Sequence, residues 1–385
     1  MNEFAVFDAH VDSLQRQLDL GQDLGRQTEG HLDLVRGQAG GLTTAVFVCW
    51  VDPKYIAPES QGARARAEAL LGEFHSLARM HPHRLRFAGN GEMLAAAHAA
   101  GAIAGVPGIE GGHAIEEDLE TLQSLFLAGI RVLTLVWNNH LSWIRSCREG
   151  AGPETPAGLS AFGRDVVRAM NELGMLVDLS HAGERSFFDA LEASSAPVIA
   201  SHSGCHALHG HPRNLTDDQL RALAGNGGVV GIPFCVAFLS REAQDEDARL
   251  RKTPGYLAIQ GRNDTDLSLQ QGRYLQAEAA PLSIDRVLDH LVHAVEVAGI
   301  DHVGIGSDYD GIGRTPRGLE DASCYGALTG RLLARGFGPE DVTKVMGGNL
   351  HRVFAQVTGP RTLASRTAAP VSAGTAADGG KTGFR

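Results

Sequence analysis

The sequence predicts an α/β fold, a (β/α)8 or TIM barrel, on the strength of three observations. Eight short apolar runs rich in β-branched residues recur along the chain, and helical patterns lie between several of them. Polar residues of the kinds that bind metals stand at or just past the ends of five of these runs. Strands that alternate with helices indicate βα units of a parallel sheet, and eight such units favour closure into a barrel. In such a barrel the strand ends converge on one mouth, where catalytic residues lie.

The predicted strands are nearly continuous apolar runs. This pattern is typical of parallel strands that are buried on both faces, whereas a half-exposed strand alternates apolar and polar residues. The eight strands are expected at residues 4–10, 43–50, 102–110, 131–137, 175–181, 197–202, 228–234 and 302–308.

Helical patterns fill several of the connections. The clearest covers 160–173, where Ser160 can cap the N-terminus and Gly174 can end the helix. Its apolar stripe consists of Phe162, Val166, Val167, Met170 and Leu173. A second helix is expected to start near Ser283 and to run to Gly299.

Two connections are long. The stretch 51–101 is expected to hold helices near 62–80 and 91–100. The stretch 235–301 contains a charge-dense excursion, 241–280, which is either a solvated surface segment or a lid over the barrel mouth. We therefore predict one barrel domain over 1–357, followed by a low-complexity, disordered tail over 358–385 that is rich in Ala, Gly, Ser and Thr.

Composition excludes several classes of protein. The chain has 385 residues, of which 43% are hydrophobic and 21% charged, as in soluble globular proteins. A net charge of −11 argues against nucleic acid or an anionic membrane as a partner. The N-terminus lacks the pattern of a signal peptide. Five scattered cysteines, with no Cys-x-x-Cys pair, argue against a disulfide framework, so we expect a reducing, cytoplasmic location.

Five residues at the strand ends could bind metal ions together. His10 and Asp12 are two apart, so on a strand they point to the same side. Glu110 is followed by two glycines, and its two oxygens could bridge two cations. His181 and His202 end consecutive strands, and neutral imidazole is a good ligand for zinc and related ions. Each residue alone could be structural, but jointly they predict a two-metal site.

The last predicted strand ends at Asp308. This residue could bind a metal, act as a general base, or do both, and Asp310 competes for the role. We expect one ion at His10, Asp12, Glu110 and Asp308, and a second at Glu110, His181 and His202. Because a metal can lower the pKa of a bound water from about 15.7 to near 7, a hydroxide held between the ions would attack a carbonyl or phosphoryl centre.

These motifs, in this order over about residues 4–356, resemble the membrane (renal) dipeptidase family, zinc enzymes of the amidohydrolase superfamily. The resemblance is carried by Asp-Ala-His-Val-Asp, Gly-Ile-Glu-Gly-Gly-His, Leu-Val-Asp-Leu-Ser-His, Ala-Ser-His-Ser, Pro-Arg-Asn-Leu-Thr-Asp-Asp and Gly-Ser-Asp-Tyr-Asp-Gly. It implies a barrel of the metal-dependent hydrolase type with two Zn²⁺ per chain, bridged by Glu110 and a hydroxide. It also implies a homodimer that hydrolyses dipeptides, with a D-residue accepted at the C-terminal position by many members.

The resemblance assigns roles residue by residue. The metal ligands would be His10, Asp12, Glu110, His181 and His202. Asp308 would take a proton from the attacking water and return it to the leaving amine. Arg213, in His-Pro-Arg-Asn-Leu, would hold the carboxylate of the substrate, although a surface salt bridge is the alternative for this residue.

Two departures concern the substrate. Where mammalian relatives have a His after the fourth strand, this chain has Trp137, and His140 follows three residues later, so both are candidates for substrate binding. Where the family has Asn-Phe-Tyr after the seventh strand, this chain has Pro233-Phe234-Cys235, which removes a Tyr from the pocket.

The leading hypothesis is therefore a soluble zinc dipeptidase. The alternatives are a metal-dependent amidohydrolase that tailors a peptide-like metabolite, a non-catalytic binding protein, and a phosphotriester or lactone hydrolase, in which Arg213 would have no obvious role. Histidine and carboxylate ligands would also hold manganese, iron or cobalt.

Overall fold

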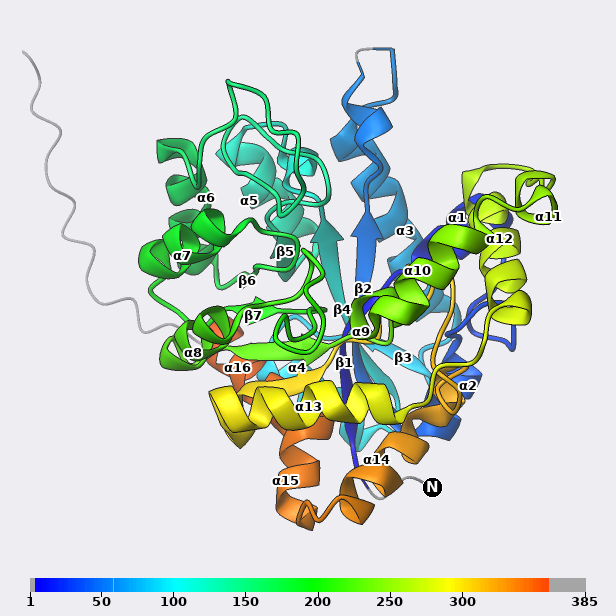
Figure 1. Cartoon of the computed structure of the whole chain (residues 1–385). Coiled ribbons are helices and arrows are strands. Elements are labelled where there is room, and N and C mark those ends of the chain that lie inside the picture. The colour runs from blue at the N-terminus through cyan, green and yellow to red at the C-terminus, as the bar shows by residue number, and fades with distance from the viewer. Residues whose placement is uncertain (1–3, 58, 360–385) are drawn as a thin grey trace, which may run out of the picture.

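Eight parallel strands close into a barrel in the computed structural model, which describes residues 4–57 and 59–359 (Figure 1). Hydrogen bonding runs in the order β2-β1-β9-β8-β7-β6-β5-β4, and pairing of β2 with β4 closes the circle. The barrel strands are β1 (Val6–Val11), β2 (Leu42–Trp50), β4 (Ile103–Glu110), β5 (Val132–Thr134), β6 (Leu176–Asp178), β7 (Ile199–Ala200), β8 (Val229–Ile232) and β9 (Val303–Ile305). The predicted fold class is confirmed.

A ninth strand, β3 (Leu85–Phe87), lies outside this circle. It pairs in parallel with the first half of β4, whereas β5 pairs with the second half of β4. The sequence analysis did not predict β3, because three residues with a central exposed Arg86 give no apolar run.

Each predicted strand overlaps one of the barrel strands, and six of the eight contain it completely; β1 ends one residue later than predicted and β2 begins one residue earlier. Most observed strands are shorter than predicted. The predicted strand 131–137, for example, keeps ladder pairing only over Val132–Thr134. Beyond that point the backbone turns into loops at the barrel mouth. Sequence hydrophobicity continues past the strand ends because these loops are themselves buried.

The α-helices of the described residues follow the barrel strands along the chain, and most of them lie around the barrel (Figure 1). They are α1 (Leu14–Leu20), α2 (Leu34–Gly40), α3 (Ala63–Met80), α4 (Gly91–Ala99), α5 (Leu119–Ala128), α6 (Ala161–Leu173), α7 (Glu184–Ala193), α8 (Asp217–Gly225), α9 (Val236–Leu239), α10 (Arg241–Leu250), α11 (Pro254–Leu257), α12 (Asp264–Glu278), α13 (Asp285–Ala298), α14 (Tyr325–Ala334), α15 (Pro339–Thr343) and α16 (Asn349–Thr358). None of the described helices is both long enough and apolar enough to cross a membrane.

The predicted helices are confirmed, and α6 follows the prediction most closely. The side chain of Ser160 accepts a hydrogen bond from the backbone N–H of Gly163, and Gly174 ends the helix with φ of 81°. Val166, Val167 and Met170 are fully buried, as the apolar stripe requires. The helix expected from Ser283 is α13, which begins at Asp285 and ends just before Gly299.

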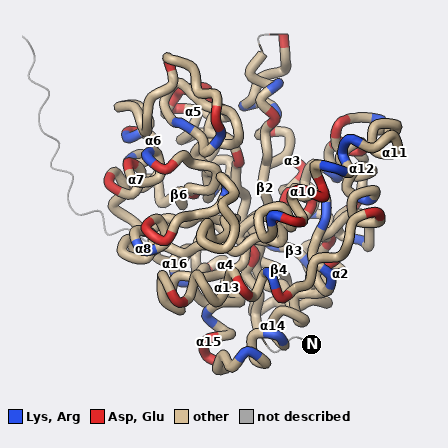
Figure 2. The backbone as a smooth tube through the Cα atoms, in the orientation of Figure 1, with Lys and Arg blue, Asp and Glu red and all other residues tan. Residues whose placement is uncertain are grey.

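The charge-dense excursion 241–280 forms α10, α11 and α12 beside the barrel mouth (Figure 1). Thr265, in α12, donates a 2.6 Å hydrogen bond to the carboxylate of Asp19 in α1, which also accepts two 2.7 Å bonds from Arg66. The excursion is thus fastened to the first helix of the barrel. Short groups of Lys and Arg and of Asp and Glu follow one another along it, and the two signs are interspersed over the rest of the chain as well (Figure 2).

The predicted tail over 358–385 lies outside the described residues, except for its first two positions. Thr358 is the last residue of α16, so the final helix extends one residue beyond the predicted domain boundary.

We expect Gly231→Ala to destabilise the barrel, because an added Cβ in β8 would lie 2.1 Å from the backbone oxygen of Ser201 in the neighbouring strand connection. Overpacking of this kind costs about 1–3 kcal/mol. The matched control is Gly72→Ala in α3, where an added Cβ meets nothing within 4 Å; removing a helical glycine should stabilise the protein by about 0.5–1 kcal/mol. Urea unfolding followed by circular dichroism measures both, and equal stability of the two variants would contradict the packing described.

Candidate metal centre

The six predicted metal-site and proton-transfer residues all lie at the C-terminal ends of barrel strands. His10 lies within β1 and Asp12 follows it; Glu110 ends β4. The other three lie two or three residues beyond strands β6, β7 and β9; they are His181, His202 and Asp308. Their side chains are buried, with exposures from 1% to 8%. The barrel therefore brings residues from five strands to the floor of one mouth.

Glu110 occupies the middle of this group. Its Oε1 lies 2.9 Å from Nε2 of His181 and 3.4 Å from Nε2 of His202, and its Oε2 lies 3.7 Å from Nε2 of His10. Asp12 completes the second side, with Oδ2 3.4 Å from Nε2 of His10. One carboxylate thus faces a different set of ligand atoms with each oxygen, which is the geometry of a bridging ligand.

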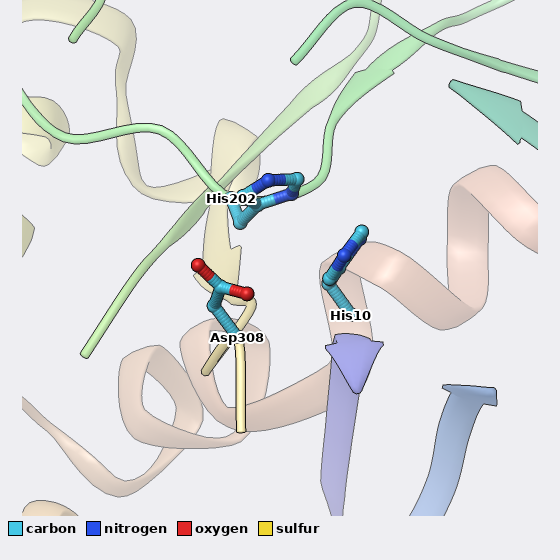
Figure 3. A group of neighbouring side chains, drawn as sticks. All are labelled: His10, His202 and Asp308. Carbon is cyan, nitrogen blue, oxygen red and sulfur yellow. The ribbon is translucent and has the colours of Figure 1, made fainter. Parts of the chain in front are cut away.

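The cluster contains three overlapping sets of three residues. Within each set, the potential ligand atoms lie within 4.8 Å of one another. The sets are His10, Asp12 and Glu110; Glu110, His181 and His202; and His10, His202 and Asp308. Figure 3 shows the third set, in which the three side chains turn toward one common space. Histidine and carboxylate in this combination form sites for zinc and other first-row metals.

Several buried atoms of the cluster lack a hydrogen-bond partner among the described residues. They are Nε2 of His10, Oδ1 of Asp12 and Oε1 of Glu110. Burying a polar atom without a partner costs free energy, and more so for a charged group. All three are atoms of the kinds that bind metals, and they belong to the candidate ligand sets, so a cation bound among them would give each a partner.

The imidazoles of the second set stay neutral at pH 7. Burial, followed by the nearby Arg213 guanidinium, lowers the pKa of His181 to about 4. Burial, followed by repulsion from His10, holds the pKa of His202 well below its ordinary value. A neutral imidazole keeps a free lone pair, which a metal requires.

The buried cluster also holds the carboxyl groups of Asp12, Glu110 and Asp308. Burial acts to lower the pKa of His10, but the charges of Glu110 and Asp12 outweigh it and hold that pKa well above its ordinary value. Burial acts to raise the pKa of Glu110, but His10 and His181 outweigh it and hold that pKa well below its ordinary value. Burial, and then the charges of Asp12 and Glu110, raise the pKa of Asp308 against the opposing effect of His10. Buried charge of one sign is tolerated only when it is compensated. The donor set and the charge balance both fit divalent cations.

Two site residues have an unusual backbone conformation. His181 has φ of 67° and Asp308 has φ of 62°, in the left-handed region that residues other than glycine rarely adopt. Such a conformation costs on the order of 1–3 kcal/mol and tends to occur at functional sites. Here it turns each side chain toward the cluster immediately after its strand has ended.

Asp310, the predicted competitor of Asp308, has a different role in the structure. It pairs with Arg16 at 2.8 Å and accepts hydrogen bonds from Ser13 at 2.5 Å and from the backbone N–H of His31 at 2.6 Å. These contacts use its carboxylate to join α1 to the loop after β9, and Asp308 is the residue that faces the ligand cluster.

A cavity of about 670 Å³ opens above the cluster. Its walls include Asp308, Arg213 and Trp137, together with residues of α12 such as Thr265 and Leu275. The excursion 241–280 therefore forms part of the cavity wall, which corresponds more closely to the predicted lid than to the predicted solvated surface segment.

Arg213 is positioned to bind an anion in this cavity. Its Nη2 donates a 3.0 Å hydrogen bond to the backbone oxygen of His202, while its buried Nε has no partner among the described residues. Its guanidinium lies 5.3 Å from the ring of Phe238. Within the described residues no carboxylate lies within salt-bridge distance of Arg213, which contrasts with the predicted alternative of a surface salt bridge.

The two predicted replacements for the family His occupy different places. Trp137 lines the cavity, packs edge-on against Trp50 with ring centroids 5.1 Å apart, and lies 6.2 Å from the ring of His181. His140 lies outside the residues that line the cavity, and its Nδ1 accepts a hydrogen bond from the backbone N–H of Ser146. Of the two, only Trp137 is placed to touch a molecule in the cavity.

Sequence reasoning missed the residues that hold the ligands from behind. Asn138 Oδ1 lies 3.1 Å from Nδ1 of His181, so it can accept the Nδ1 proton and leave Nε2 for a metal. Asp178 and Ser201 form a similar support beneath His202. Asp178 and Ser201 belong to the motifs Val-Asp-Leu-Ser-His and Ala-Ser-His, which contain two of the predicted ligands. Their closeness in sequence to these ligands was the one signal that could have identified them.

Comparison with known proteins gives consistent matches over the whole barrel. A family model described as membrane dipeptidase (peptidase family M19) matches residues 1–367. An uncharacterized dipeptidase of Schizosaccharomyces pombe is 30% identical over 365 residues, which cover 91% of this chain and 79% of that protein.

Solved structures match over a similar extent. The dipeptidase AC, a metallopeptidase of family M19, is 29% identical with a TM-score of 0.76, over 93% of this chain and 99% of that one. A metallopeptidase from Rhodobacter sphaeroides, solved with a phosphinate mimic of the dipeptide L-Ala-D-Ala, is 28% identical with a TM-score of 0.75, over 92% of this chain and 99% of that one.

We expect Gly311→Ala to weaken binding of divalent cations at least about tenfold, as other changes to the supports of metal ligands do. An added Cβ would lie 2.2 Å from Oδ2 of Asp12 and 2.4 Å from Oδ1 of Asp308, so both carboxylates would have to move. Gly313→Ala is the control, because its added Cβ first meets a side-chain atom of Leu275 at 3.3 Å. Titration of metal-free protein with Zn²⁺ measures the affinity, and wild-type affinity in Gly311→Ala would contradict the placement of the two carboxylates.

Proposed function

Because the chain belongs to the membrane dipeptidase family, peptidase family M19, whose members are metallopeptidases, we propose that it is a binuclear zinc dipeptidase. The observation that carries this proposal is the position of Glu110, with one oxygen facing His181 and His202 and the other facing His10. A carboxylate whose two oxygens face two different sets of ligands is suited to bridge two ions. With a single bound ion, one of the two sets would be left without a metal.

The residues that would hold the two ions are those of the buried cluster. His10, Asp12 and Glu110 would bind one, and Glu110, His181 and His202 the other. Three neutral or neutralisable imidazoles favour zinc over calcium or magnesium, which prefer oxygen ligands. Bound zinc would supply Lewis acidity that polarises a carbonyl and lowers the pKa of a coordinated water.

Arg213 would orient the substrate. Its unpartnered Nε and the fork geometry of a guanidinium suit the C-terminal carboxylate of a dipeptide. This fixed end would place the peptide carbonyl over the metal ligands, since Arg213 and the ligand cluster line the same cavity. Holding the reacting groups in this way removes much of the entropic barrier to reaction.

Asp308 would move the proton. Water adds to the peptide carbonyl carbon, and Asp308 accepts the proton that this water loses. The C–N bond then breaks as Asp308 returns the proton to the departing nitrogen, which yields two amino acids. A burial-raised pKa suits a carboxyl group that must both accept and release a proton near neutral pH.

The stereochemistry of the substrate can be proposed as well. The Rhodobacter sphaeroides relative was solved with a mimic of L-Ala-D-Ala, and it covers nearly the whole barrel of this chain at 28% identity. We propose that this protein also accepts a D-residue at the C-terminal position. Trp137 and Trp50, which line the cavity beside His181, would contact a substrate side chain.

A second candidate keeps the metals and changes the substrate. The cavity volume of about 670 Å³ lies within the range of about 300–1,000 Å³ that is typical of pockets for drug-sized ligands, and it is larger than a pair of alanine residues needs. This volume, with the wall contributed by α12, favours an amidohydrolase that tailors a peptide-like metabolite as the alternative to a dipeptidase.

The experiment that separates these candidates is a panel of substrates with zinc-loaded protein. The panel contains L-L and L-D dipeptides, the same dipeptides with a C-terminal amide, and N-acylated forms. The dipeptidase proposal expects cleavage of free dipeptides and much slower cleavage of the amides, which lack the carboxylate that Arg213 would bind. Cleavage of none of the free dipeptides would favour the tailoring enzyme.

We expect Asp308→Asn to lower kcat by about 10²–10⁴-fold, the usual contribution of a general acid–base group. Two zinc ions should remain bound, because the ligand sets around Glu110 are complete without Asp308. The control is Asp52→Asn, since Asp52 lines the same cavity but caps the turn η1 (Pro53–Ile56) and lies outside the ligand sets. Metal analysis and steady-state kinetics provide the two measurements, and near wild-type kcat in zinc-loaded Asp308→Asn would refute the assigned role.

A further inference from the structure

One buried hydroxyl touches ligands from both halves of the metal site. Ser201 is the residue that follows β7, and its side chain is buried. Its Oγ lies 2.8 Å from Nδ1 of His202 and 3.3 Å from Nδ1 of His10. These two histidines belong to the two different ligand sets that share Glu110. A single oxygen atom therefore contacts an imidazole of each set, on the side away from the ligand atoms.

The direction of these hydrogen bonds is fixed by Asp178. This buried carboxylate accepts four hydrogen bonds. Its Oδ1 accepts from the backbone N–H groups of Ser180, at 3.0 Å, and Ser201, at 2.8 Å. Its Oδ2 accepts from two hydroxyls. The two hydroxyls are Oγ1 of Thr134, at 2.5 Å, and Oγ of Ser201, at 2.6 Å. A serine hydroxyl has one proton and two lone pairs. Since its proton goes to Asp178, Ser201 can only accept from its other polar neighbours, which are the two imidazoles and, at 3.3 Å, the hydroxyl of Ser180.

This direction determines which nitrogen of each imidazole carries the proton. A lone pair on Ser201 is satisfied by an Nδ1–H group, so His10 and His202 both keep the proton on Nδ1 when neutral. Their Nε2 atoms are then free of a proton and face the cluster, where Nε2 of His10 is one of the unpartnered buried atoms. An unprotonated Nε2 is the form that binds a metal.

We propose that Ser201, oriented by Asp178, is a positioning residue that fixes the tautomers of both His10 and His202. The affinities of the two cation positions would then depend on the same hydroxyl. The inference rests on the proposed binuclear metal site and adds two residues that touch neither the cations nor the substrate. It explains why a serine and an aspartate are fully buried beneath a polar site, where each would otherwise be costly.

The test compares Zn²⁺ binding by metal-free wild type and Ser201→Ala, measured by competition with a chromophoric chelator. Losing the hydroxyl should weaken binding of both ions by about 10–100-fold, the range seen when support of a metal ligand is removed. The matched control is Ser203→Ala, two residues along the chain. Ser203 is equally buried, but its hydroxyl has no partner among the described residues, so wild-type affinity is expected.

Asp178→Asn tests the direction of the hydrogen bonds with almost no change of shape. The backbone N–H groups of Ser180 and Ser201 require the amide oxygen, so the NH₂ group would face the Ser201 hydroxyl and donate to it. The hydroxyl proton would then point at the imidazoles and favour the Nε2–H form, as an Asp→Asn change behind a catalytic histidine does. The ¹⁵N shifts of histidine side chains in zinc-loaded protein report which nitrogen is protonated. Wild type should show Nδ1–H for both residues, and Asp178→Asn should bind zinc as weakly as Ser201→Ala.

The outcomes separate this inference from the proposed function. Wild type that binds two zinc ions, with Ser201→Ala and Asp178→Asn also binding both at wild-type affinity, would overturn the inference alone. Weaker binding of only one of the two ions would overturn the claim that both cation positions depend on Ser201. Wild type that binds no zinc would overturn the metal site itself. Ser201→Thr keeps the hydroxyl and should retain wild-type affinity; together with Asp178→Asn it decides the question if Ser201→Ala does not fold.

Discussion

The repulsion among three buried carboxylates is the constraint on which the rest of the structure depends. Asp12, Glu110 and Asp308 meet at the floor of one barrel mouth with almost no access to water. His181 and His202 are neutral there, whereas burial acts to lower the pKa of His10 but the charges of Glu110 and Asp12 outweigh it and hold that pKa well above its ordinary value. Desolvated charge of one sign destabilises a fold by several kcal/mol per ion unless it is compensated. Divalent cations would compensate it and would also give partners to the unpartnered atoms of the cluster. The chemistry and the stability of the site are therefore two consequences of one arrangement of charge.

Two further buried carboxylates, those of Asp8 and Asp178, support the cluster by accepting hydrogen bonds from backbone N–H groups in and after the strands. Asp8 accepts hydrogen bonds from the backbone N–H groups of His10, at 3.1 Å, and Ser307, at 2.9 Å, and from the hydroxyl of Tyr325, so it joins β1 to the loop that carries Asp308. Asp178 does the same for β6 and β7. Ligands of a metal site need rigid support because small displacements lose much of the binding energy. The left-handed backbone of His181 and Asp308 is a conformation that such support can maintain.

The sequence predicted those features that are encoded locally. Strand positions follow from apolar runs, α6 follows from a stripe with a Ser160 cap and a glycine end, and the ligands follow from polar residues at strand ends. It could not show that β3 pairs outside the barrel or that Asp310 pairs with Arg16, because these outcomes depend on contacts between distant segments. The bond of His140 to Ser146 is local, but it depends on a loop conformation that no pattern in the sequence indicates. The excursion 241–280 was ambiguous for the same reason. Its composition is that of a surface segment, and contacts with distant residues such as Asp19, Glu29 and Arg314 hold it as part of the cavity wall.

The central claim is that Glu110 lies between two cations. A crystal structure of the zinc-loaded protein, with anomalous data collected on both sides of the zinc absorption edge, tests it most directly. The account predicts two zinc peaks about 3.5–4 Å apart, one on each side of the Glu110 carboxylate. A single peak, or peaks that leave Glu110 without a metal contact, would contradict it.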